Sequence, residues 1–149
     1  MSFFSLKTAG CGNRTRITLL LCLVSFPVHA ETVNLNIISQ IESSGNASAI
    51  GDRGLALGLF QLHAGAVKDA SRALNVAYKH RDALDPKTAR VIADAYINQV
   101  IPSYLKHYRL KDTLENRLTA YNMGIGAVKA GKVSKKYVQK YKKLERENV

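Results

Sequence analysis

Thiols are scarce in this sequence, and both of them lie near its start. Cys11 and Cys22 are the only cysteines, and both fall within residues 1–30. The residues that follow can therefore form no disulfide bond, bind no iron–sulfur cluster through cysteine and supply no cysteine nucleophile. Without such crosslinks, a domain built from them must be stabilised by its apolar core alone.

Long apolar runs are also missing. The stretch from Ile17 to Phe26 is too short for a transmembrane helix, which needs about 20 apolar residues. Three basic residues precede it and Val28-His29-Ala30 follows it, which is the order of segments in a secretory signal peptide. We predict that residues 1–30 are a cleaved signal peptide and that residues 31–149 form one exported domain without a stable membrane span. A retained membrane anchor is the alternative.

Acidic residues are few relative to basic ones. The chain has 22 Lys and Arg against 11 Asp and Glu, a formal net charge of +11, and residues 1–30 contribute three basic residues and no acidic one, so +8 remains without them. This sign of charge favours an anionic partner. Export argues against nucleic acid, whereas the bacterial cell wall fits both observations. We interpret the lysines from Lys129 to Lys143 as a solvated helix face that also helps to hold the protein on such a polymer.

Several catalytic motifs are absent from the sequence. No HExxH spacing or acidic partner motif indicates a metal site, and we predict neither a metal nor a cofactor. A GxSxG nucleophile elbow and a phosphate-cradling loop are missing too. No repeat or low-complexity linker divides residues 31–149, which favours a single domain.

Helical patterns fill most of residues 31–149. Apolar residues recur at helical spacing over residues 33–42, 64–74, 86–100, 114–122 and 134–144. Pro102 is expected to kink the third helix or to split it from a second segment. Asp112 and Glu115 have the spacing of a capping box, which predicts Asp112 as the N-cap of the fourth.

Residues 43–62 interrupt these helical patterns. They contain four glycines among small polar residues, which is the composition of tight turns. Gly51 to Gly54 is predicted to form a turn flanked by short hairpin arms. The predicted fold is therefore α+β and predominantly helical, with a small irregular or β-hairpin region after the first helix.

Three blocks and a late tyrosine resemble a known family. The segments are Glu42-Ser43-Ser44-Gly45-Asn46, Gly58-Leu59-Phe60-Gln61-Leu62, the run from Ala120 to Gly126 (AYNMGIG), and Tyr137-Val138. In this order they resemble the soluble-lytic-transglycosylase-type (SLT) domain of the lysozyme-like superfamily, in particular its small members associated with secretion and conjugation. The resemblance covers nearly all of residues 31–149. The chain departs from the family pattern at Gly51, where many members have serine, and at His63, where the family often has methionine.

The resemblance implies roles for the matched residues. Glu42 is expected to be the single catalytic acid/base. A carboxyl group on an apolar wall resists ionisation, so it can hold a proton near neutral pH and deliver it to a glycosidic oxygen. The residues expected to bind substrate are Ser43, Ser44, Gln61, His63, Tyr121 and Asn122. Tyr121 can also be a core aromatic residue, and Asn122 can equally be a helix C-cap.

Asp52 is the nearest acid to Glu42 in the sequence. Glycosidases with two carboxylates separate them by about 5–5.5 Å when they retain configuration and about 6.5–9.5 Å when they invert it. We interpret Asp52 as a turn former that bonds its own backbone or pairs with Arg53. A second catalytic carboxylate is the alternative, although enzymes of the resembled family work with one glutamate.

The resemblance also implies a reaction and a place of action. The expected substrate is the glycan strand of peptidoglycan, cleaved between N-acetylmuramic acid and N-acetylglucosamine with a 1,6-anhydro end as product. A periplasmic location and components of a secretion, conjugation or pilus apparatus as partners are expected, and nucleic acid is not. Two alternatives remain open: a muramidase that uses water, and a non-catalytic wall-binding assembly protein.

Overall fold

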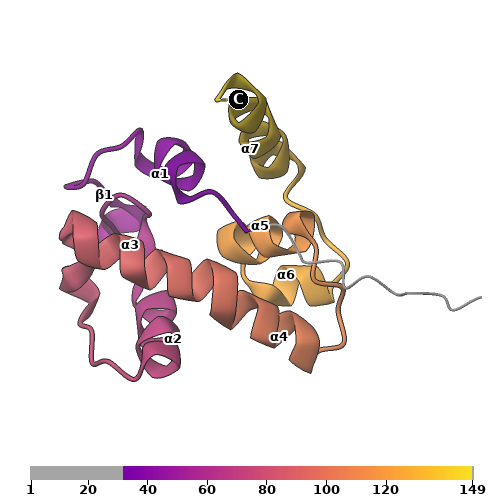
Figure 1. Cartoon of the computed structure of the whole chain (residues 1–149), viewed down its shortest axis with the longest axis horizontal. Helices are drawn as coiled ribbons and strands as arrows, with labels where there is room; N and C mark the ends of the chain where they lie inside the picture. The colour runs from indigo at the N-terminus through magenta and orange to yellow at the C-terminus, as the bar shows by residue number, and fades with distance from the viewer. Residues whose placement is uncertain (1–31, 149) are drawn as a thin grey trace, which may run out of the picture.

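The computed structural model of this protein describes residues 32–148, so the predicted signal peptide lies outside the described residues. These residues are mostly helical (Figure 1). The helices are α1 (Leu35–Ser43), α2 (Ala64–Leu74), α3 (Pro86–Ala95), α4 (Ile101–His107), α5 (Leu114–Met123), α6 (Ile125–Lys129) and α7 (Lys135–Glu147). The strands are β1 (Ile50–Gly51), β2 (Ala56–Leu57) and β3 (Leu62–His63). The predicted α+β, predominantly helical fold is confirmed.

Helix α1 forms because its start and its end are both capped locally. The side chain of Asn34 accepts a hydrogen bond from the backbone N–H of Asn36 at 2.9 Å, which satisfies one of the free donors at the N-terminus. The left-handed Ser44 (φ 55°) and Gly45 (φ 80°) end the helix. The left-handed C-terminal cap therefore begins at Ser44, one residue before the glycine that usually takes this conformation. Glu42 consequently lies in the last turn of α1.

The predicted hairpin arms form a small three-stranded antiparallel sheet in the order β1-β2-β3. Ile50 faces Leu57 in the first pair, and Leu57 faces Leu62 in the second. The tight link between β2 and β3 begins at Gly58, which has a φ of +73°. A Cβ atom at this position would collide with the carbonyl oxygen of Ala83. Only glycine allows the hairpin to pack this closely on the 3₁₀ turn η2 (His80–Leu84).

Helices α3 and α4 are joined by the π-helical turn η3 into one long helical rod, which runs across the molecule in Figure 1. Asp85 caps its start by accepting a hydrogen bond from Thr88 N at 2.8 Å, as its Asp-Pro step predicts. The rod is not split at Pro102, so that part of the prediction is wrong. Residues 96–100 instead form a π-helical turn, η3 (Tyr96–Val100). The wider turn lets the chain accommodate a proline, whose ring and missing N–H disrupt a regular α-helix.

The predicted N-cap of α5 is wrong by one residue. Thr113, not Asp112, caps the helix by accepting a hydrogen bond from Asn116 N at 3.2 Å. The carboxylate of Asp112 is used elsewhere, because its two oxygens accept hydrogen bonds from Nε and Nη2 of Arg117 at 2.6 and 2.7 Å. Arg117 is only 7 % exposed. A buried cation without a counter-ion would cost more free energy than the loss of a cap by Asp112, which Thr113 can replace.

The core lies where α1, the rod, α5 and α7 meet. Its largest fully buried side chains are Tyr141, Phe60, Ile37, Ile38, Leu62, Ile92, Ile97, Ile101, Leu105 and Leu118. The hydroxyl of Tyr141 accepts a hydrogen bond from Asn34 N at 2.8 Å, which fixes the start of α1 to α7. Among residues 32–148, no helix is both long and apolar enough to traverse a bilayer.

Candidate active site

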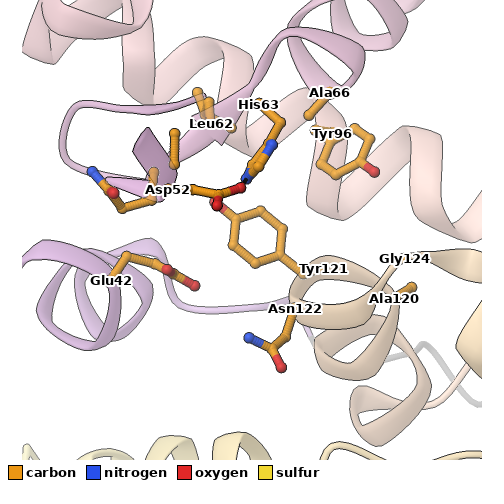
Figure 2. Close-up of a pocket in the computed structure, with 12 residues that line it drawn as sticks. Glu42, Asp52, Leu62, His63, Ala66, Tyr96, Ala120, Tyr121, Asn122 and Gly124 are labelled. Atoms are coloured by element: carbon orange, nitrogen blue, oxygen red, sulfur yellow. Dashed lines mark ion pairs between the residues drawn. The ribbon is translucent and has the colours of Figure 1, made fainter. Parts of the chain in front are cut away.

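A pocket of about 510 Å³ opens between the end of α1, the sheet and α5. Figure 2 shows the residues that line it. The predicted site residues among them are Glu42, Asp52, Gln61, His63, Tyr121 and Asn122. Predicted residues that do not line it are Ser43 and Ser44. Segments that are far apart in the sequence therefore converge on Glu42.

Glu42 projects from the last turn of α1 into this pocket (Figure 2). Its side chain is half-buried, and Oε1 accepts a hydrogen bond of 2.6 Å from the hydroxyl of Tyr137. Burial raises the pKa of Glu42 above its ordinary value, and the Tyr137 hydrogen bond and the charges of Lys140 and His63 oppose that rise. Glu42 thus binds a proton more tightly than an ordinary glutamate, while its carboxylate form still has stabilising partners.

Tyr137 has a place at the site that sequence reasoning missed. It is only 8 % exposed, and its periodicity within α7 assigns it simply to the apolar face. Burial and the neighbouring Glu42 raise the pKa of Tyr137, so its hydroxyl keeps its proton and acts as a donor to the carboxyl group. The resemblance of the Tyr137-Val138 step to the family was the one available signal.

Tyr121 packs its ring in the pocket wall, but its hydroxyl does not bind Glu42. The hydroxyl donates to the carbonyl oxygen of Phe60 at 2.6 Å, which joins α5 to the turn between β2 and β3. Its ring lies 6.1 Å from the ring of Tyr96, centroid to centroid. Tyr121 therefore holds the two walls of the pocket together and contributes aromatic surface to it.

Tyr96 is a second pocket residue that the sequence did not single out. It occupies the first position of the π turn η3 and lines the pocket next to Tyr121. In the sequence it belongs to the apolar side of a long helix, and nothing distinguishes it from the core residues nearby. Pro102, six residues later, was the only signal of an irregular turn here.

Gln61 stabilises the sheet from within the pocket. Its amide nitrogen Nε2 donates to the carbonyl oxygens of Ala49 at 3.2 Å and Gly58 at 3.0 Å. A Cβ atom on Gly51 would collide with Oε1 of this amide. The Gln61 side chain can therefore lie here only because residue 51 is glycine. Many members of the resembled family have serine at that position.

Asp52 and His63 form an exposed pair on the sheet side of the pocket. Nε2 of His63 lies 3.6 Å from Oδ2 of Asp52, and the two side chains are 54 % and 59 % exposed. Asp52 also accepts a turn hydrogen bond from Leu55 N through its backbone carbonyl, at 3.1 Å. It is thus a turn residue, as interpreted from the sequence, but its carboxylate faces His63 and not Arg53.

Of the three remaining predicted residues, two connect the elements around the pocket. Ser43 donates its hydroxyl to the carbonyl oxygen of Leu59 at 2.8 Å and so joins the end of α1 to the sheet. Ser44 is the exposed left-handed cap of α1. Asn122 accepts a hydrogen bond of 2.8 Å from the hydroxyl of Ser134, which ties the end of α5 to the start of α7.

The described part of the chain holds no cluster of three or more His, Cys, Asp or Glu side chains that could bind a metal ion. The pocket does hold one half-buried carboxyl group, Glu42, with a hydrogen-bond donor in Tyr137. Such a group can deliver a proton to a leaving oxygen and later accept one.

Comparison with known proteins gives one family. The model of the transglycosylase SLT domain matches residues 29–144, a range that contains every residue of the pocket. No curated protein matches the chain.

Proposed function

The chain belongs to the transglycosylase SLT domain family, and from this premise we propose that it is a lytic transglycosylase in which Glu42 is the acid/base. Its substrate is the peptidoglycan glycan strand. It cleaves the β-1,4 bond between N-acetylmuramic acid and N-acetylglucosamine and leaves a 1,6-anhydro end.

The observation that carries this proposal is the environment of Glu42. A half-buried carboxyl group in the wall of a pocket, with a raised pKa and one fixed donor on Oε1, suits a group that must be protonated first and ionised later. Burial favours the protonated form that begins the reaction. The Tyr137 hydroxyl and the Lys140 and His63 charges favour the carboxylate that the first step leaves behind.

The reaction proceeds in two proton transfers. Protonated Glu42 donates to the bridging oxygen, the bond between that oxygen and C1 of N-acetylmuramic acid breaks, and N-acetylglucosamine leaves with a free 4-hydroxyl. Positive charge develops at C1, beside the new carboxylate. The 6-hydroxyl of the same sugar then attacks C1 while Glu42 accepts its proton. The products are the two glycan ends, and Glu42 is protonated again.

The muramidase alternative is favoured by one observation. Asp52 lines the same pocket as Glu42, where a second carboxylate would direct a water molecule. Its side chain, however, is 59 % exposed and faces His63. An exposed carboxylate retains its hydration and is a weak catalytic base, so we place the reaction on Glu42 alone.

We also propose that the protein acts in the periplasm after removal of residues 1–30. There it would open the wall locally for a secretion, conjugation or pilus apparatus. The signal-peptide pattern and the net positive charge support the location, and the resemblance to small family members supports the apparatus. N-terminal sequencing of the exported protein tests the cleavage, and residue 31 is the expected first residue.

Mass spectrometry of the fragments released from peptidoglycan tests the reaction. The purified exported protein should release fragments with 1,6-anhydro ends. The matched variant Glu42→Gln, which keeps the shape of the side chain, should be slower by about 10²–10⁴-fold while remaining folded. Fragments with reducing ends only would indicate a muramidase. No release by the wild-type protein would favour a wall-binding protein.

A further inference from the structure

One flank of α7 carries lysines beside the candidate acid. Lys136, Lys140 and Lys143 are separated by four and three residues, so they lie along one side of the helix. All three are exposed. Lys143 lies 3.8 Å from Glu147, whereas Lys136 and Lys140 form no ion pair within residues 32–148. We call Lys136 and Lys140 the lysine flank.

Lys140 of the lysine flank lies next to the candidate acid. Nζ of Lys140 donates to the carbonyl oxygen of Ile41 at 3.2 Å, one residue before Glu42. Tyr137, one turn earlier on α7, binds Glu42 itself. Ser134, two residues before Lys136, binds Asn122 in the pocket wall. The start of α7 therefore runs from Asn122, in the pocket wall, to the end of α1, and the helix packs against both α5 and α1.

The contact with Ile41 also fixes where the positive charge lies. The C-terminal carbonyl groups of a helix carry partial negative charge, which stabilises a cation at the end of α1. The Lys140 ammonium is held at this point, and its charge acts on Glu42. The protein thus holds a positive charge at the end of α1, next to Glu42, with Lys136 one turn away on the same side of α7.

The chemistry of the proposed substrate indicates what this charge binds. The sugar rings of an intact glycan strand are neutral, so they offer no counter-ion to the lysine flank. The peptide attached to N-acetylmuramic acid ends in ionised carboxylates and projects away from the strand beside the bond that is cleaved. A lysine ammonium group held next to Glu42 can pair with such a carboxylate.

We propose that Lys136 and Lys140 bind carboxylates of the peptide that peptidoglycan carries next to the cleaved bond, and that this contact makes the enzyme prefer strands with charged peptides. The inference rests on the proposed function, because it concerns the substrate of the same pocket. The lysine flank is a specificity surface, and it takes no part in the proton transfers.

Two matched substrates isolate the charge of the peptide. One is peptidoglycan strands with native peptides, and the other is the same strands whose peptide carboxylates have been converted to amides with a carbodiimide and ammonia. The measured quantity is the ratio of kcat/KM on the two substrates. Because Lys140 also acts on Glu42, this ratio is more informative than either rate, since an effect on the acid alone cancels in it.

The wild-type protein should prefer the native strands by about two- to fivefold for each lysine that forms a pair. The ratio should fall to about 1 in the double variant Lys136→Gln/Lys140→Gln. The control is Lys135→Gln/Lys142→Gln, which removes the same charge from another side of α7 and should keep the wild-type ratio. The inference is overturned if the wild-type protein cleaves both substrates equally well, or if the control loses the preference as fully as the lysine-flank variant. Cleavage of neither substrate would overturn the proposed function together with this inference.

Discussion

The hydroxyl of Tyr137 donates a 2.6 Å hydrogen bond to Oε1 of Glu42, and the two residues are 95 positions apart in the sequence. This contact joins the last turn of α1 to the first turn of α7. The candidate acid comes from one end of the described chain and its fixed donor from the other. The protonation of Glu42 therefore depends on how well the C-terminal helix packs.

Removing this hydroxyl should change the pH dependence of cleavage. In Tyr137→Phe the carboxylate form of Glu42 loses a stabilising donor, so the pKa of Glu42 should rise further. The enzyme needs the protonated acid, and the alkaline limb of the pH–rate profile should therefore move to higher pH. The rate at the optimum should also fall, because the carboxyl group loses the contact that orients it. Release of soluble fragments from peptidoglycan, measured across the pH range, tests this.

The matched control is Tyr141→Phe, one helical turn further along α7. This variant loses the bond that Tyr141 accepts from Asn34 N, and the unfolding free energy should fall by about 1–3 kcal/mol. Its pH profile should keep the wild-type shape, because the bond that it loses lies at the start of α1, whereas Tyr137 donates to Glu42 at the end of that helix. An unchanged alkaline limb in Tyr137→Phe would contradict the role given to the Tyr137 hydroxyl.

The partial burial of Glu42 should also make the free energy of unfolding depend on pH. Burial raises its pKa, so the folded protein binds this proton more tightly than the unfolded chain does. The stabilising contribution is complete below the ordinary glutamate pKa and is lost as the pH rises through the higher folded value. Glu42→Gln should therefore be more stable than the wild-type protein at alkaline pH, with the advantage disappearing in acid.

Urea denaturation on either side of the ordinary glutamate pKa of about 4.3 measures this difference. The exposed Glu115 provides the comparison, and Glu115→Gln should gain no stability as the pH rises. A Glu42→Gln advantage that stays constant with pH would show that burial of the charge is not its cause.

Much of the fold could be predicted because its signals are local. The spacing of apolar residues before Glu42 and the Asp85-Pro86 step each specify a helix from within a few residues. The glycines from Gly45 to Gly58 likewise indicate the turns of the sheet. Competition between neighbours is harder to predict. Asp112 and Thr113 are both competent N-caps, and the choice between them is decided by Arg117, whose burial depends on the whole fold.

Some residues of the candidate site could likewise be predicted from local patterns, and others could not. The segment around Glu42 and Gln61 and the segment around Tyr121 carry compact patterns, and the structure brings them to one pocket. Tyr96 carries no pattern of its own, and Tyr137 carries only the short Tyr137-Val138 step. An inward-facing tyrosine on a helix has the same spacing whether it fills the core or contributes to a site. Their positions follow from the packing of α7 and from the π turn, both of which are tertiary features.

Replacing Asp52 should have little effect if Glu42 works alone. The carboxylate of Asp52 is 59 % exposed. The pKa of Glu42 is raised by burial and lowered by Tyr137, Lys140 and His63, and Asp52 is not among these causes. Asp52→Asn should lower the rate by less than about tenfold, whereas loss of a true catalytic base costs about 10²–10⁴-fold. Mass spectrometry should find the same proportion of 1,6-anhydro ends. A variant that shifts the products or loses activity by the larger factor would make Asp52 a second catalytic carboxylate.

The last prediction concerns stability away from the pocket and follows from the Asp112–Arg117 pair. Asp112→Ala leaves the guanidinium of Arg117 buried, with Asn98 Oδ1 at 3.5 Å as a distant acceptor. The unfolding free energy should fall by about 2–3 kcal/mol, less than for a fully buried pair because the Asp112 carboxylate is 35 % exposed. Thr113→Ala removes only a helix cap and should cost about 1 kcal/mol. Chemical denaturation of both variants tests this order. If Asp112 were the N-cap that its sequence spacing predicts, Thr113→Ala would be nearly neutral.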